Sequence, residues 1–148
     1  MITGGNMKKA LIIPIILLAM FSLVSCSKKE VKQVTDDSKT AREAITVSEA
    51  VKEAYLKRNL MDLEKSSTKE GYREVLGAMK SFDKAELTFM PKWIDMDKTS
   101  VSLKIAWNGT WVVKGQTTEE RGLAIFVFEG RPLKLARILR ANPFRQPE

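Results

Sequence analysis

The spacing of apolar residues changes once along this chain, near Ala85, and this change restricts the fold more than any other feature. Before Ala85, apolar side chains recur at three- and four-residue steps, which is typical of amphipathic helices. After it, they alternate with polar residues, which is typical of strands. Helices followed by a series of strands predict an α+β domain, with the N-terminal helices packed on one face of a curved antiparallel sheet.

Two capping motifs predict where the helices begin. Thr46 and Ser67 are each followed three residues later by a glutamate, which is the pattern of a capping box. The helical pattern breaks at Arg58-Asn59, and a short turn follows at residues 60 to 63. We therefore expect one helix that begins at Thr46 and ends before Arg58, and a second that begins at Ser67 and ends near Asp83.

Turn residues divide the alternating part into strands. Turns are predicted at residues 95 to 98, at Gly115-Gln116 and, as a two-residue hairpin, at Gly130-Arg131. Residues 123 to 128 are all apolar, so we expect that strand to be buried on both faces, and the last strand runs from 132 to about 141. Asn108-Gly109 has two interpretations, a tight hairpin turn or a bulge within one long strand, and we favour the bulge.

The first 25 residues have the parts of a secretory signal: Lys8-Lys9, an apolar run from residue 10 to 21, and small residues before a cleavage point. The apolar stretch from Ala10 to Val24 spans 15 residues, fewer than the ~20 that a transmembrane helix needs. The only cysteine of the chain, Cys26, comes directly after this stretch. The alternatives are an uncleaved anchor, or a secretory signal followed by an unmodified cysteine.

Leu23-Val24-Ser25-Cys26 resembles the lipobox of bacterial lipoproteins. The resemblance implies that residues 1 to 25 are a removed signal peptide and that lipid on Cys26 anchors the protein in the bacterial cell envelope. Because Ser27 is not an aspartate, it also implies the outer membrane if the organism has one, and the plasma membrane otherwise. Residues 26 to 44 are polar and charged, which predicts a flexible tether before a domain from 45 to 148.

Composition excludes several kinds of site. With no histidine and one cysteine, the chain cannot form a histidine base, a histidine-ligated metal, an internal disulfide or an iron–sulfur site. Asp95 and Asp97 lack the other ligands of a calcium loop, so we expect a turn there, and neither a metal nor another cofactor. The net charge is +7, or +5 without Lys8 and Lys9. We interpret it as an ordinary soluble surface, with anionic lipid head groups or cell-wall polymer as the alternative and no nucleic acid as partner.

Several short motifs follow one another in roughly the last hundred residues. They are the break at 58 to 63, the apolar runs at 126 to 128 and 133 to 135, Ile138, and Asn142-Pro143-Phe144. This order resembles the nuclear-transport-factor-2-like superfamily, including its SnoaL-like and lipoprotein branches. The resemblance implies a cone of helices and sheet whose open end often holds a pocket. Some members are isomerases, dehydratases or cyclases, while many only bind ligands or partners, often as dimers.

Six residues are the candidate lining of such a pocket: Tyr55, Trp107, Trp111, Phe126, Phe128 and Arg137. A hairpin at Gly130-Arg131 would pair Phe126 with Leu135 and Ala124 with Arg137, which places Arg137 on the same face as the aromatic rings. There its guanidinium could hold a carboxylate or a phosphate. The alternatives are an arginine at the rim of the sheet and aromatic residues that simply form the core.

These features predict a lipid-anchored envelope protein whose domain is a non-catalytic binding module. Its partner would be a small apolar or anionic ligand, an envelope protein, or a second copy in a homodimer. The alternative is a SnoaL-type isomerase or hydrolase that uses Tyr55 and an unidentified acid. A proton-transfer enzyme needs a positioned base, and the sequence offers none that can be named.

Overall fold

A computed structural model of the chain describes residues 35 to 147. Three helices come first, and four strands follow: α2 (Asp36–Leu56), α3 (Leu60–Lys65), α4 (Lys69–Ala78), β1 (Lys84–Met96), β2 (Ser100–Val113), β3 (Gln116–Glu129) and β4 (Lys134–Arg140). Each strand pairs antiparallel with the next, in the order β1-β2-β3-β4. The predicted α+β class is confirmed.

The predicted signal peptide, Cys26 and the tether up to residue 34 lie outside the described residues. Between residues 35 and 147, no helix combines the length and the apolar character needed to span a bilayer.

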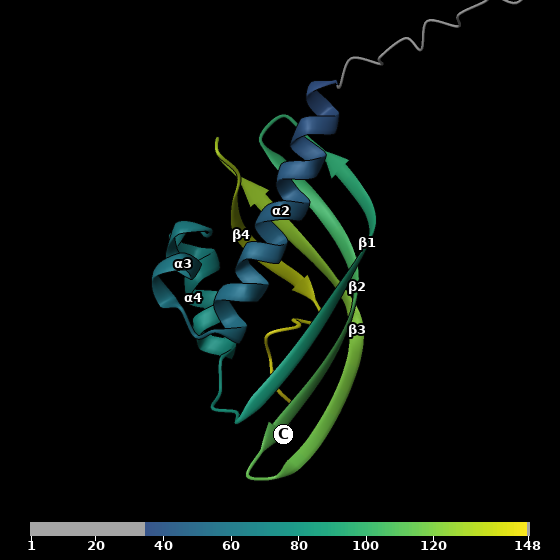
Figure 1. The fold of residues 1–148 in the computed structure, drawn as a ribbon. Helices are drawn as coiled ribbons and strands as arrows, with labels where there is room; N and C mark the ends of the chain where they lie inside the picture. The colour runs from purple at the N-terminus through teal and green to yellow at the C-terminus, as the bar shows by residue number, and fades with distance from the viewer. Residues whose placement is uncertain (1–34, 148) are drawn as a thin grey trace, which may run out of the picture. The chain divides into compact units, whose positions relative to one another are not determined.

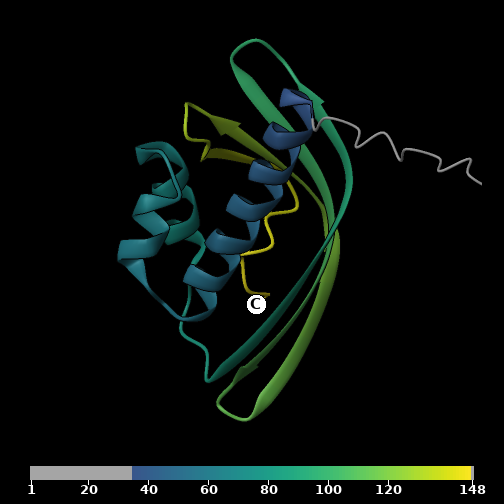
Figure 2. The ribbon, with the colours of Figure 1, turned by 45° about the horizontal axis from the view of Figure 1, so that its top comes forward.

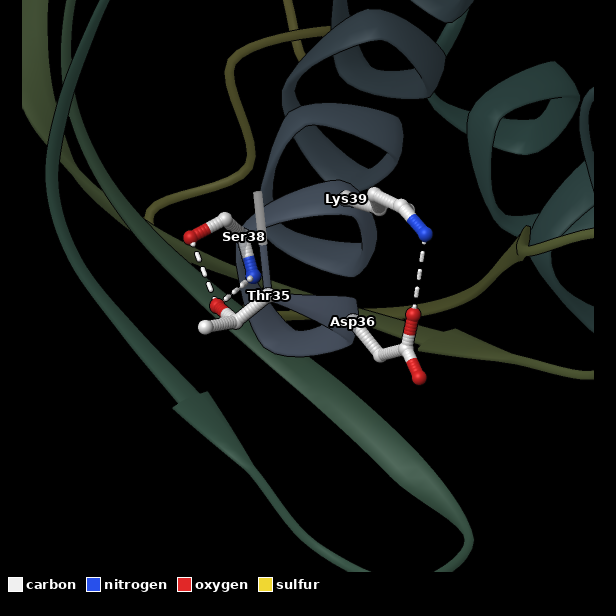
Figure 3. A network of polar contacts seen from close by, with 4 residues as sticks. All are labelled: Thr35, Asp36, Ser38 and Lys39. Atoms are coloured by element: carbon white, nitrogen blue, oxygen red, sulfur yellow. Dashed lines mark hydrogen bonds and ion pairs between the residues drawn. The ribbon is translucent and has the colours of Figure 1, made fainter. Parts of the chain in front are cut away.

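The N-cap of helix α2 lies eleven residues earlier than the sequence pattern predicts, so residues 36 to 44 belong to the helix and not to a tether. Thr35 is the N-cap: its hydroxyl accepts the amide hydrogen of Ser38 at 3.2 Å (Figure 3). Lys39 pairs with Asp36 at 3.0 Å in the same turn (Figure 3). The predicted cap, Thr46, lies in the middle of the helix. The start was missed because residues 36 to 43 are almost all polar and none of them is buried, so no apolar stripe marks the first two turns. Ser48 is the polar residue of the buried stripe, and its hydroxyl donates to the carbonyl of Ile45 at 2.7 Å.

The second cap is also displaced, by one residue. Thr68, not Ser67, caps α4 by accepting the amide hydrogen of Gly71 at 3.2 Å, and the helix ends at Ala78 instead of near Asp83. Gly71 lets this helix approach β4 closely, because a Cβ atom there would lie 2.0 Å from the carbonyl oxygen of Leu135. The predicted break before α3 is a residue in the left-handed region, Arg58, with φ of 53°.

Strand β2 passes through Asn108 and Gly109 with an unbroken register toward both neighbours, so neither the predicted hairpin nor the predicted bulge forms there. The glycine has a packing role instead. A Cβ atom at Gly109 would lie 2.2 Å from the ring of Trp111. The irregularities of the sheet fall elsewhere, at Lys92 in β1 and next to Val127 in the pairing of β3 with β4.

The helices cover the concave face of the sheet, while Figures 1 and 2 show no helix on the convex face. Most buried side chains of the strands point to the concave face. They are Leu87, Phe89, Val101, Leu103, Ile105, Trp107, Trp111, Ala124, Phe126, Phe128, Leu135 and Ile138. The prediction that β3 is buried on both faces is wrong at Leu123, which is 41% exposed on the convex side, although Val127 is buried there.

Candidate functional site

The space between the helices and the sheet is filled by aromatic rings. Tyr55 of α2 contacts Phe144, with ring centroids 5.1 Å apart, and Phe144 stacks on Phe126 at 6.0 Å. Phe89 of β1 meets Phe126 edge-on at 5.5 Å. All three of Tyr55, Phe126 and Phe144 are 0% exposed. The position at which the resemblance implies a pocket is therefore occupied by the chain's own side chains.

The hydroxyl of Tyr55 lies inside this cluster. It accepts the indole hydrogen of Trp111 at 3.0 Å, which satisfies the polar atom of both buried rings. Burial raises the pKa of Tyr55, and the bond from Trp111 and the charge of Arg58 offset part of that increase. Tyr55 is therefore a neutral phenol at physiological pH. Among residues 35 to 147, the hydrogen-bond partner of this hydroxyl is the indole of Trp111 and not a carboxyl group.

The other predicted aromatic residues also belong to the core. Trp107 is 1% exposed, and its indole donates to the carbonyl of Ala141 at 3.0 Å. Phe128 is 0% exposed and meets Phe126 edge-on at 6.3 Å. The structure therefore brings five of the six candidates together, as packed core residues and not around an open cavity.

Arg137 does not join them. It pairs with Val127 instead of Ala124, and its side chain is 63% exposed on the convex face, 4.0 Å from a carboxylate oxygen of Glu129. The predicted two-residue hairpin is a longer connection at residues 130 to 133, and the pairing shifts again between Val127 and Phe128. A shift of one residue moves a side chain to the other face of a sheet, so the proposed arginine site on the concave face does not form.

The segment after β4 completes the core, whereas the sequence analysis used it only as one motif of the family resemblance. Asn142 shapes it: the side-chain oxygen accepts the amide hydrogen of Phe144 at 2.9 Å, and the carbonyl accepts that of Arg145 at 3.2 Å. This turn aims the ring of Phe144 into the aromatic cluster. Figure 2 shows the segment running between α2 and the sheet.

Several hollows lie at the surface of the described residues. One, of about 250 Å³, lies between the first turns of α2 and the β1–β2 turn, with charged side chains Asp37, Glu43, Lys98 and Arg131 on its walls. A second, of about 300 Å³, lies between α4 and the end of β4, with Glu74, Glu120, Arg140 and Arg145. Both mix acidic and basic groups. Within the described part of the chain, no three cysteine or carboxylate side chains gather as metal ligands.

Comparison with known proteins supports the architecture. No protein-family model matches the chain, and no curated protein matches it by sequence. One solved structure that it resembles is a nuclear transport factor 2 (NTF2-like) superfamily protein from Salmonella enterica subsp. enterica serovar Typhimurium str. LT2. The TM-score is 0.59 over 72% of this chain and 93% of that one, at 15% identity. The fold is nuclear-transport-factor-2-like. An identity this low shows the fold alone.

The convex face of this nuclear-transport-factor-2-like sheet carries an apolar surface that the sequence analysis did not single out. The register aligns Trp93, Lys104, Ile125 and Leu139 as one row across all four strands, with Leu123 beside it. We call these five residues the outer patch. Three of them are large and exposed: Trp93 at 69%, Leu139 at 45% and Leu123 at 41%. Contiguous exposed apolar side chains of this size mark interaction surfaces more often than single exposed ones do.

Proposed function

We propose that this chain is a lipid-anchored protein of the bacterial cell envelope whose nuclear-transport-factor-2-like domain recognises its partner through the surface and performs no catalysis. The anchor is supported by the lipobox pattern that ends at Cys26. The second part rests on one observation, the filled interior. Tyr55, Trp111 and Phe144 are fully buried against one another, at the place where a small ligand would otherwise bind.

The filled interior narrows the choice of partner. A small apolar ligand would have to displace Phe144 from its contacts with Tyr55 and Phe126. An anionic ligand in either of the two hollows described above would lie beside acidic as well as basic side chains, so neither hollow favours an anion clearly. A macromolecular partner needs no cavity, because flat surfaces with exposed aromatic side chains are sufficient for docking.

Lipidation is tested on the full chain produced in a bacterial host. Intact-mass analysis should show a product that begins at Cys26 and carries acyl chains, and detergent but not high salt should release it from membranes. A matched Cys26→Ala variant should lack the acyl mass. A soluble wild-type product without acyl chains would contradict the anchor.

The filled interior is tested separately by native mass spectrometry of the detergent-solubilised protein. We expect the mass of the lipidated chain with no additional small molecule. A co-purifying apolar molecule that is retained by the wild type and equally by Leu123→Gln combined with Leu139→Gln would contradict docking through the surface, because the interior and not the outer patch would then hold it.

A further inference from the structure

We infer that the outer patch is a membrane-contacting surface, which lies against the phospholipid bilayer and fixes the orientation of the domain. Trp93, Leu123 and Leu139 would enter the interfacial region, and the ammonium of Lys104 would lie beside lipid phosphates. The inference rests on the proposed function in one respect, the lipid anchor at Cys26, which holds the domain close to the membrane.

The first support is the placement of the exposed apolar side chains. Trp93 pairs with Lys104, Lys104 with Ile125, and Ile125 with Leu139, so these residues point to one face of the sheet. Leu123 lies on the same face, two residues before Ile125. That face is convex and free of helices in both ribbon views (Figures 1 and 2). A surface that projects outward can reach a flat bilayer, whereas a concave one cannot.

The second support is the lysine in the middle of the row. Lysine is depleted from the cores of protein–protein interfaces, because its ammonium loses water without gaining a partner. At a membrane surface the same side chain keeps its charged end among phosphates while its methylenes lie along apolar groups. Among residues 35 to 147, the ion pairs leave Lys104 without a carboxylate partner. Tryptophan beside lysine is the side-chain combination found at bilayer interfaces.

The neighbouring row of the convex face is less basic. It runs from Asp95 through Ser102 and Val127 to Arg137. Arg137 lies 4.0 Å from Glu129, so a nearby carboxylate offsets much of its charge. Within these two rows, electrostatic attraction to anionic lipid therefore depends mainly on Lys104, and the apolar side chains supply most of the contact. This arrangement is suited to orienting a domain that acyl chains already hold, since it is too small to hold one alone.

The third support is the length of chain between the anchor and the domain. Ten residue steps separate Cys26 from Asp36, so the first residue of α2 stays within about 35 Å of the lipidated cysteine. The first turns of α2 and the β1–β2 turn line the same hollow, so they lie at one end of the domain. Lys104 is four residues from the start of β2, or about 13 Å along the strand from that turn. Lys104 therefore lies in the half of β2 that is closer to the β1–β2 turn, and this turn lies at the same end of the domain as the first turns of α2.

The test uses the fluorescence of Trp93 in the full, lipidated chain. Trp107 and Trp111 are 1% and 0% exposed, so Trp93 is the tryptophan that quenchers can reach. The protein is reconstituted into phosphatylethanolamine–phosphatidylglycerol vesicles, with and without brominated acyl chains. We expect brominated lipid to reduce the emission of Trp93 about twofold and the vesicles to protect it from aqueous iodide. Trp93→Phe should remove the quenched component.

Matched variants separate the patch from exposed residues in general. Leu123→Gln combined with Leu139→Gln should lower the quenching by brominated lipid, whereas Met61→Gln should not, because Met61 is 66% exposed but lies on α3, outside the patch. Lys104→Gln should weaken the dependence of quenching on the phosphatidylglycerol fraction. Lys69→Gln, at the start of α4, is the control for that charge change. A melting curve for each variant verifies that the domain is folded.

Two results would overturn the inference. Trp93 that stays open to iodide and insensitive to brominated lipid would show that the face lies in water. Trp93 shielded from both quenchers, with crosslinks from position 123 to a second copy or to another protein, would show a protein interface. Neither outcome depends on the anchor, since the intact mass at Cys26 reports lipidation separately, and loss of the acyl mass would contradict the proposed function instead.

Discussion

Replacing Tyr55 by phenylalanine tests whether the hydrogen bond inside the aromatic cluster supports the fold. The substitution keeps the ring and removes the hydroxyl that accepts the indole hydrogen of Trp111 at 3.0 Å. A buried donor left without a partner costs about 1–3 kcal/mol. We expect Tyr55→Phe to lower the free energy of unfolding by about 2 kcal/mol, which reduces the folding equilibrium constant about thirtyfold. For a domain of this size the melting temperature would fall by about 8 °C.

The same variant should change how stability depends on pH. The pKa of Tyr55 is raised in the folded state above its ordinary value of 10.0, chiefly by burial. Above that value the unfolded chain releases the proton while the folded chain still holds it, so the stability of the wild type falls as pH rises. Phenylalanine has no such proton. The stability difference between wild type and Tyr55→Phe should therefore be largest near neutral pH and become smaller above pH 10.0.

Urea denaturation followed by tryptophan fluorescence measures both effects, at neutral pH and at about pH 11. Tyr72→Phe is the matched control, because it removes the other of the two tyrosines and leaves the bond between Tyr55 and Trp111 in place. A loss below about 0.5 kcal/mol at neutral pH would refute the reasoning, since that is the range of ordinary surface substitutions. A difference that widens at alkaline pH would refute the direction of the pKa shift.

Three further pairs of substitutions test the packing and one helix cap. Phe144→Ala should cost about 3–5 kcal/mol by leaving a cavity in the aromatic cluster, and the exposed Leu76→Ala less than about 0.5 kcal/mol, both by urea denaturation. Gly71→Ala should lower the melting temperature strongly, because its Cβ would meet the backbone of β4. Gly77→Ala, with open space around the new Cβ, should raise the free energy of unfolding by about 0.5–1 kcal/mol. Equal effects of the two substitutions would contradict the close approach of α4 to β4. Thr68→Ala should cost about 1 kcal/mol by removing the cap of α4, and Thr68→Ser should restore most of it.

The fold class was predictable because the period of apolar residues changes near Ala85, and a change from helix to strand spacing leaves few arrangements. The beginning of α2 was not. Its buried stripe begins only at Ala44, and residues 36 to 43 are almost all polar and none of them is buried, so no apolar period marks the first two turns. Ser48 can be buried only because its hydroxyl donates to the carbonyl of Ile45, a contact that a pattern of apolar positions does not contain.

The candidate site was predictable only in part. Trp107, Trp111, Phe126 and Phe128 do converge, because alternation alone assigns strand residues to a face. Tyr55 joins them because it lies on the buried stripe of α2. Arg137 was misplaced, since the shift in register between β3 and β4 leaves no mark in the alternation of apolar residues. Phe144 fills the interior from a segment that is neither helix nor strand. Such a segment has no periodic pattern of apolar residues, so the sequence alone could not place its ring.

The contact of Phe144 with Tyr55 joins positions that are 89 residues apart, and this separation sets an order of events during synthesis. Until the ribosome has made the final stretch, the hydrophobic interior stays open, however well the first helices have formed. Folding that waits for such distant contacts is slow. A chain that folds late in this way would stay able to pass through a secretion channel, which the N-terminal signal proposed above would require.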